Sequence, residues 1–145
     1  MAQSALSIVA RILIVTIYFM SAIGNKIPKF SDVANTMGAE GVPAPSILLV
    51  GAIVFLIVGS LSILFGFKAR IGALLLLIFL VLATYYFHDF WNFQGQEQQS
   101  QLIQFMKNLS LIGTMAFLVA NGSGAGSLDR CLASPNATLS IPNAN

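Results

Sequence analysis

The residues best suited to chemistry lie together in segment 84–91, where one apolar run ends. The run that begins at Ile71 closes on the chain's one histidine, His88, which is followed by Asp89 and then by the one tryptophan, Trp91. A histidine exchanges protons near neutral pH, and an adjacent carboxylate can orient it. The pair therefore marks a candidate proton-transfer site. The competing interpretation is an interfacial belt, because aromatic residues collect where a membrane span meets water.

A second polar pair lies inside the next apolar run. Lys107 and Asn108 follow about one and a half turns after that run begins at Leu102. A lysine within a span is costly unless it is paired, reaches the membrane surface or meets water. We predict that Lys107 pairs with His88 or Asp89 on the neighbouring helix. Extension of the lysine to the surface is the alternative.

The first apolar segment carries further polar residues on one face. Arg11, Tyr18 and Asn25 share a helical face through their seven-residue spacing, and Lys26 follows directly. We expect this face to look inward, although Arg11 could instead extend to the membrane surface. The predicted polar site comprises Arg11, Tyr18, Asn25, Lys26, His88, Asp89, Trp91, Lys107 and Asn108.

Cysteine and histidine usage limits the cofactors that the chain could hold. Its single cysteine, Cys131, excludes an internal disulfide, a CxxC redox pair and an iron–sulfur site, and a single histidine excludes a haem pair. A flavin fingerprint and a glycine-rich phosphate loop are also missing from the sequence. We therefore expect no intrinsic cofactor and no metal. Any redox role needs a ligand such as a quinone, or a partner, from outside.

The elements that must position these residues are membrane-spanning helices. With 57% hydrophobic and 8% charged residues, the 145-residue chain has the composition of an all-α, polytopic membrane protein. Its charges are spread thinly, so the expected partner is the lipid bilayer and not a nucleic acid. Each of four apolar runs approaches the roughly 20 residues that cross a bilayer. These runs, at 6–23, 44–65, 71–87 and 102–120, predict a left-handed four-helix bundle.

The connections between the spans differ in character. Phe30, Val33 and Met37 recur at helical spacing in the long first connection, which predicts a short interfacial helix over residues 29–38. That helix would either cover the bundle as a lid or only space two spans. The glutamine-rich stretch 92–101 is predicted to be a loop. Two seams of small residues suit close helix packing, namely Gly59, Ser62 and Gly66, and Gly113, Ala116 and Ala120.

The four spans define the domain organisation and the topology. Residues 1–128 form the predicted transmembrane domain, and the polar residues 129–145 form a flexible tail. An even number of spans places both termini on one side of the membrane. A slight excess of Lys and Arg on that side favours cytoplasmic termini in a multi-pass protein of the inner (cytoplasmic) membrane.

The order of short motifs along the chain resembles the DoxX family of small four-helix bacterial membrane proteins. The motifs are Ala10-Arg11, Ser21-x-x-Gly24-x-x-Ile27, Gly41-Val42-Pro43, Gly66-x-x-x-Arg70, Phe87-His88-x-Phe90-Trp91, Phe105-Met106-Lys107-Asn108-Leu109 and Gly126-Ser127-Leu128-Asp129. One departure stands in the second span. Many family members carry a glutamate there, where this chain reads Leu56-Ile57-Val58.

The resemblance implies a range of roles, because some relatives are subunits of a thiosulfate:quinone oxidoreductase and others are partners in oxidative-stress complexes. The first interpretation is a redox-accessory or quinone-interacting membrane subunit, with the polar site at one membrane face. The second is a module that binds a small amphiphile or lipid. The third is a structural or assembly subunit that packs against a larger membrane complex. Whether any catalysis occurs is left open, since the step from fold to function is analogy.

Overall fold

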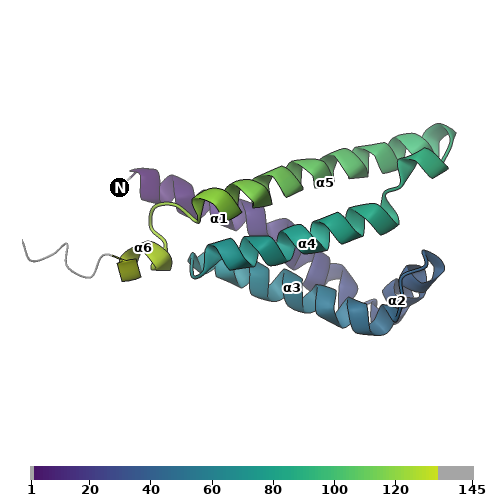
Figure 1. Ribbon diagram of the computed structural model, residues 1–145, viewed down its shortest axis with the longest axis horizontal. Helices are drawn as coiled ribbons and strands as arrows, with labels where there is room; N and C mark the ends of the chain where they lie inside the picture. The colour runs from purple at the N-terminus through teal and green to yellow at the C-terminus, as the bar shows by residue number, and fades with distance from the viewer. Residues whose placement is uncertain (1, 134–145) are drawn as a thin grey trace, which may run out of the picture.

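The computed structural model describes residues 2–133. All regular secondary structure in this range is helical (Figure 1). Its four long helices are α1 (Ala2–Ser21), α3 (Pro45–Phe65), α4 (Ala69–Phe87) and α5 (Gly95–Asn121). A π-helical turn, η1 (Ala22–Lys26), extends α1. All four are long and apolar enough to cross a membrane. The predicted fold class is therefore confirmed.

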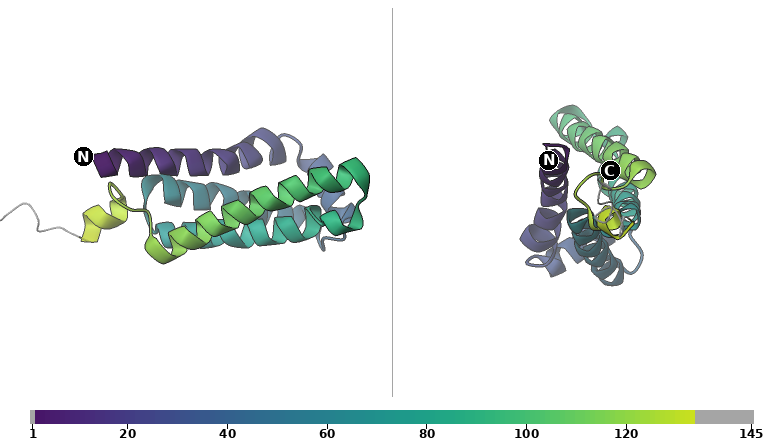
Figure 2. Two further views of the ribbon diagram at one scale, coloured as in Figure 1. Left: turned by 90° about the horizontal axis from the view of Figure 1, so that it is seen from above. Right: turned by 90° about the vertical axis from the view of Figure 1, so that its left-hand side faces the viewer.

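The helices form a bundle in which neighbours in the sequence are mostly neighbours in space. Close contacts join α1 to α3, α3 to α4, and α4 to α5. The main core cluster lies between them and consists of Val15, Tyr18, Ala22, Leu56, Ile63, Ala73, Leu76, Leu80, Met115 and Leu118. The start of α1 and the end of α5 lie at the same end of the bundle, as both views in Figure 2 show. The predicted placement of both ends on one side thus holds for the described residues.

The closest helix approach is between α3 and α4. A Cβ atom added at Gly72 would lie 2.5 Å from the Cβ of Ser62 and 2.9 Å from the carbonyl oxygen of Gly59. The predicted seam of Gly59 and Ser62 is therefore an internal contact of the bundle. The other predicted seam faces outward, because a Cβ added at Gly113 would meet nothing within 4 Å.

The predicted interfacial helix is present as α2 (Phe30–Ala39). It packs against the beginning of α3 and forms a second small core of Ala34, Met37, Val42 and Leu49. Phe30 and Val33 pack against this core, as does Phe87 at the end of α4. The helical spacing of its apolar residues thus predicted both the helix and its buried face. This helix covers the end of the bundle that carries His88.

The predicted glutamine-rich loop is mostly helix. Helix α5 begins at Gly95, so the connection from α4 is limited to residues 88–94 and includes a 3-10 turn, η2 (Phe90–Asn92). Glutamine and glutamate are good helix formers. Their polarity means only that this first part of α5 is expected to lie outside the apolar layer of the membrane. The prediction of a loop over 92–101 was wrong because polarity was taken as a sign of irregular structure.

The expected start of the flexible tail at residue 129 comes too early. Residues Leu128–Ala133 form a short helix, α6, that is tied to the bundle by Asp129. The Asp129 carboxylate accepts hydrogen bonds from the backbone N–H groups of Lys68 (2.8 Å) and Ala69 (3.2 Å), and its own N–H donates to the Gly66 carbonyl (2.9 Å). Asp129 thereby caps α4 from a distant part of the chain. Residues 134–145 of the predicted tail lie outside the described residues.

Candidate functional sites

His88 lies at the end of α4, where it is held by the first part of α5. Its Nδ1 is 2.9 Å from the Oε1 of Gln101, and the histidine is half-buried. With this oxygen as the acceptor, Nδ1 is the donor, and the corresponding neutral tautomer would leave Nε2 as an acceptor. His88 is thus an oriented base at one end of the bundle.

An aromatic group borders His88. The ring centroid of Phe90 lies 5.2 Å from that of Trp91 and 5.2 Å from that of Phe105, in edge-on arrangements. Trp91 is itself 55% exposed, so this group presents an open aromatic surface. Asp89 accepts a hydrogen bond from the side chain of Asn92 and does not orient His88. Phe90 and Trp91 follow His88 closely in the chain, and Phe105 joins them from α5.

Asn108 contributes a polar contact within the α4–α5 seam. Its Nδ2 donates to the Oγ1 of Thr84 at 3.0 Å, and the same hydroxyl donates to the carbonyl of Leu80 at 2.6 Å. Thr84 is buried one helical turn before His88. Asn108 therefore belongs to the same side of the bundle as His88, although no direct bond joins the two.

The predicted pairing of Lys107 with His88 or Asp89 is wrong. Lys107 is exposed, and its Nζ lies 3.4 Å from the Oε1 of Gln104 one turn earlier on the same helix. The seam with α4 is occupied by Asn108, and successive residues on a helix point about 100° apart. Lys107 therefore faces outward and contacts Gln104 one turn nearer the start of α5, while its predicted alternative of reaching the membrane surface stays a prediction.

The first-span residues do not form one cluster with His88. Arg11 lies near the start of α4, whereas His88 follows its end. The 19 residues of α4 span about 28 Å, so the two residues are at opposite ends of the bundle. Tyr18 is buried in the main core cluster, and its hydroxyl has no hydrogen-bond partner in the part of the chain that the structure describes. Asn25 is exposed. Lys26 donates to the Oγ of Ser21 at 2.7 Å and lies 5.3 Å from the ring centroid of Phe79.

Arg11 is the centre of a second polar site, at the end of the bundle that carries α6. Only 3% of this residue is exposed. Its Nη2 donates to the carbonyl of Gly126 at 2.8 Å, and its Nε donates to that of Ser7 at 3.3 Å. Its Nη1 has no hydrogen-bond partner among residues 2–133. The prediction that the face carrying Arg11 looks inward is therefore confirmed for Arg11.

The loop from α5 to α6 closes over Arg11. Gly122, Gly124 and Gly126 all have positive φ angles, between 68° and 77°, which lets the chain turn tightly back across α1. Ser7 fixes this loop by donating to the carbonyl of Ser123 at 3.0 Å. The Ser123 hydroxyl is buried and has no partner within the described part of the chain.

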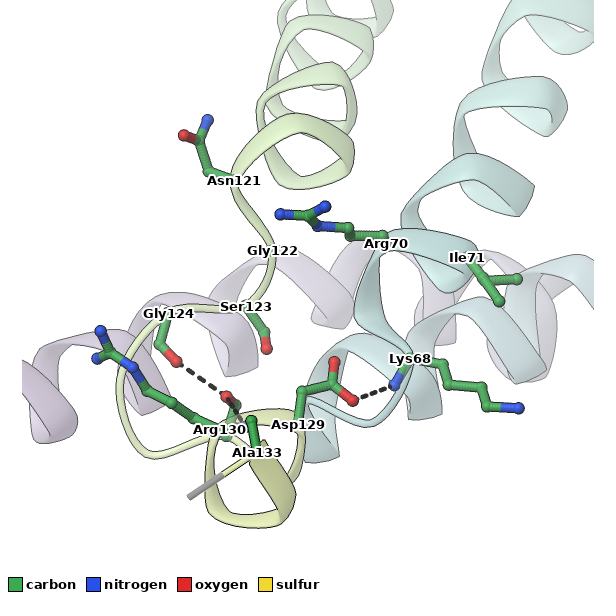
Figure 3. Close-up of a pocket in the computed structure, with 11 residues that line it drawn as sticks. Lys68, Arg70, Ile71, Asn121, Gly122, Ser123, Gly124, Asp129, Arg130 and Ala133 are labelled. Atoms are coloured by element: carbon green, nitrogen blue, oxygen red, sulfur yellow. Dashed lines mark hydrogen bonds between the residues drawn. The ribbon is translucent and has the colours of Figure 1, made fainter. Parts of the chain in front are cut away.

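Two cavities adjoin this loop. A cavity of about 440 Å³ lies on its outer side, and Figure 3 shows Arg70 reaching over Gly122 there while the Lys68 ammonium points away. A smaller cavity of about 220 Å³ lies between α1 and α5 and is lined by Arg11 and Ser123 together with apolar residues. Residues 122–124 border both cavities. Residues 122–124 therefore separate the larger cavity, which is bordered by basic residues, from the smaller and mainly apolar cavity.

Sequence reasoning singled out Arg11 here but missed the residues that enclose it. Ser7 stands in the first apolar run, and Ser123 and Gly126 stand in a glycine-rich stretch, so none of them carries a chemical signature of its own. A signal was present in the motifs that carried the family resemblance. Three of them, Ala10-Arg11, Gly66-x-x-x-Arg70 and Gly126-Ser127-Leu128-Asp129, converge at this one end of the bundle.

Comparisons with known proteins agree with the fold. The family model described as DoxX matches residues 6–89. The inner membrane protein YqjF of Escherichia coli K12 is 38% identical over 125 residues, which cover 86% of this chain and 90% of YqjF. The inner membrane protein YphA of the same organism is 30% identical over 129 residues, 89% of this chain and 91% of YphA. No solved structure matches the chain. The protein therefore belongs to the DoxX family and is an integral membrane protein with four helices suited to crossing the bilayer.

Proposed function

We propose that this protein is a quinone-interacting, redox-accessory subunit of a membrane complex, with its quinone site around His88. The single observation that carries the proposal is the hydrogen bond between His88 and Gln101. It orients the imidazole at the end of α4, and in the neutral tautomer with the proton on Nδ1 the Nε2 atom could act as an acceptor. A quinol hydroxyl can donate to such a nitrogen and give up its proton to it on oxidation.

The surroundings of His88 suit the ring of a quinone. The edges and faces of Phe90, Trp91 and Phe105 provide an aromatic surface at the depth where a headgroup would meet the imidazole. The α2 helix and the aromatic end of α4 lie at this same end of the bundle. A quinone headgroup could therefore stack beside the histidine while its tail stays in the bilayer.

Electrons would have to leave the site through another protein. With one cysteine and one histidine, the chain has no ligand set for a haem pair or an iron–sulfur cluster. In this proposal a partner subunit accepts the two electrons of a quinol, His88 accepts one of its two protons, and water at the membrane surface accepts the other. A chain that binds the quinol but passes its electrons to another protein would act as an accessory subunit.

Trp91 offers a direct test, because it is the chain's one tryptophan and lies beside the proposed site. A short-chain ubiquinone analogue should quench its fluorescence saturably in the detergent-purified protein. His88→Phe should weaken the apparent affinity roughly three- to tenfold, as expected for a lost hydrogen bond. Ser100→Ala is the matched control on the first turns of α5 and should leave the affinity unchanged.

Quenching that rises linearly with quinone concentration, with the same slope in the wild type and in His88→Phe, would contradict the proposal. It would show only that the quinone partitions into the micelle. Mass spectrometry of protein purified in mild detergent supplies an independent check, since it should detect a co-purified quinone.

A further inference from the structure

Lys26 is turned into the bundle by the π-helical turn η1 at the end of α1. Its Nζ donates to the Oγ of Ser21 at 2.7 Å, five residues earlier in the chain. In a regular α-helix two residues five apart point about 140° away from each other, since each residue turns the helix by about 100°. The wider π turn brings the two closer to one face. The lysine side chain therefore runs back along α1 and not outward to the membrane surface.

The ammonium of Lys26 lies within the apolar layer. It is 5.3 Å from the ring centroid of Phe79, which stands eight residues before Phe87 at the end of α4. Eight residues correspond to about 12 Å of helix, and half of a bilayer's hydrocarbon core is about 15 Å thick. The charge of Lys26 is therefore well inside the layer that α4 crosses.

This charge has only neutral neighbours in the described chain. One N–H of the ammonium donates to the Ser21 hydroxyl, and the Phe79 ring provides a cation–π contact. No carboxylate among residues 2–133 forms an ion pair with Lys26. Ionisable residues inside a membrane are normally paired, and they mark functional sites. A negatively charged oxygen would complete this one.

Lys26 is accessible to a ligand from the side of the bundle. Lys26, Ser21 and Phe79 are each half-buried. Helix α1 packs closely on α3 and makes few backbone contacts with α4, so the contact between Lys26 and Phe79 joins two helices that do not pack tightly together. On the same part of α1, Met20 is 63% exposed and Ile23 is 57% exposed. These side chains offer an apolar surface to a ligand that arrives from the bilayer.

From these observations we infer that Lys26 binds the carboxylate of a single-chain amphiphile, of the class of a long-chain fatty acid. Nζ donates to a carboxylate oxygen while it keeps its bond to Ser21, and the acyl chain lies along the apolar surface of α1. A fatty acid can reach this depth as the neutral acid, whereas a phosphodiester stays charged and therefore stays at the membrane surface. The site is separate from the proposed quinone site, where His88 is bonded to α5 beyond the end of α4.

Scintillation-proximity binding of radiolabelled palmitate to the detergent-purified full-length protein tests the inference. Unlabelled palmitate should displace the label saturably. Methyl palmitate has the same chain but no charge, so it should compete more weakly by roughly tenfold or more. Lys26→Met should weaken palmitate binding by a similar factor. Lys29→Met is the matched control, because it removes the same charge from an exposed position three residues later and should leave the affinity unchanged.

A palmitic acid that carries a photoreactive diazirine beside its carboxyl group locates the site independently, even if Lys26→Met fails to fold. It should label residues 20–27 or the part of α4 around Phe79. Equal competition by palmitate and methyl palmitate, equal losses in Lys26→Met and Lys29→Met, an unaffected Lys26→Met variant, or labelling confined to other segments would each overturn the inference. Displacement of palmitate by a short-chain ubiquinone analogue would also overturn it, since Lys26 would then recognise a neutral carbonyl and not a carboxylate.

Discussion

At the scale of single residues, the polar contact between Asn108 and Thr84 stands out because it lies in an otherwise apolar seam between α4 and α5. Interhelical hydrogen bonds in membrane proteins average about 0.6 kcal/mol in double-mutant cycles. We expect a coupling free energy of that order between Thr84→Val and Asn108→Leu, measured by unfolding in mixed micelles. Strictly additive single changes would show that the bond contributes nothing to the stability of the seam.

His88, Lys107 and Arg11 show how differently a membrane bundle can accommodate an ionisable group. His88 is bonded across a helix interface, Lys107 extends along its own helix, and Arg11 is enclosed by a loop. Each arrangement avoids leaving the group alone in hydrocarbon. Of these three groups, only Arg11 keeps a buried donor that has no partner among residues 2–133.

At the scale of elements, the contact between α3 and α4 depends on the absence of a side chain at Gly72. We expect Gly72→Ala to destabilise the protein by roughly 1 to 3 kcal/mol, since the new methyl group overlaps Ser62 and the Gly59 carbonyl. Thermal unfolding in detergent would measure this loss.

Gly113→Ala is the matched control for the same measurement. It introduces the same methyl group at a helical position with open space around it, so it should be neutral or stabilising by up to about 1 kcal/mol through helix propensity. Equal destabilisation by the two changes would mean that helix packing is not the cause.

At the scale of the whole molecule, the basic α6 end is predicted to face the cytoplasm, because Lys and Arg concentrate on cytoplasmic loops. The exposed Cys131 lies at this end and is the chain's one cysteine, so it serves as a natural probe. A membrane-impermeant maleimide should label Cys131 in inverted vesicles but not in intact spheroplasts.

The opposite end provides the complementary measurement. A Gln96→Cys variant that also carries Cys131→Ser should react in intact spheroplasts, since Gln96 is exposed near the start of α5. Labelling of Cys131 from outside would reverse the orientation. The arrangement of the two sites within the bundle would be unaffected.

Much of the architecture could be predicted from the sequence, for a simple physical reason. A segment that crosses lipid must satisfy its backbone groups internally and must be apolar for about 20 residues, so run length alone locates the spans. The spacing of Phe30, Val33 and Met37 located α2 in the same way, because a helix that buries one face repeats its apolar residues with the helical period.

The composition of the polar sites was decided only by the tertiary structure. The spacing of Arg11, Tyr18 and Asn25 places them on one face, but each seven-residue step also moves about 10 Å along the axis, so a shared face does not make a shared site. Lys107 and Asn108 are adjacent in sequence, and the rotation of α5 against α4 selected Asn108 for the seam. The enclosure of Arg11 depends on a glycine-rich turn that brings residue 126 back to residue 11, and such long-range closure leaves no periodic pattern in the chain.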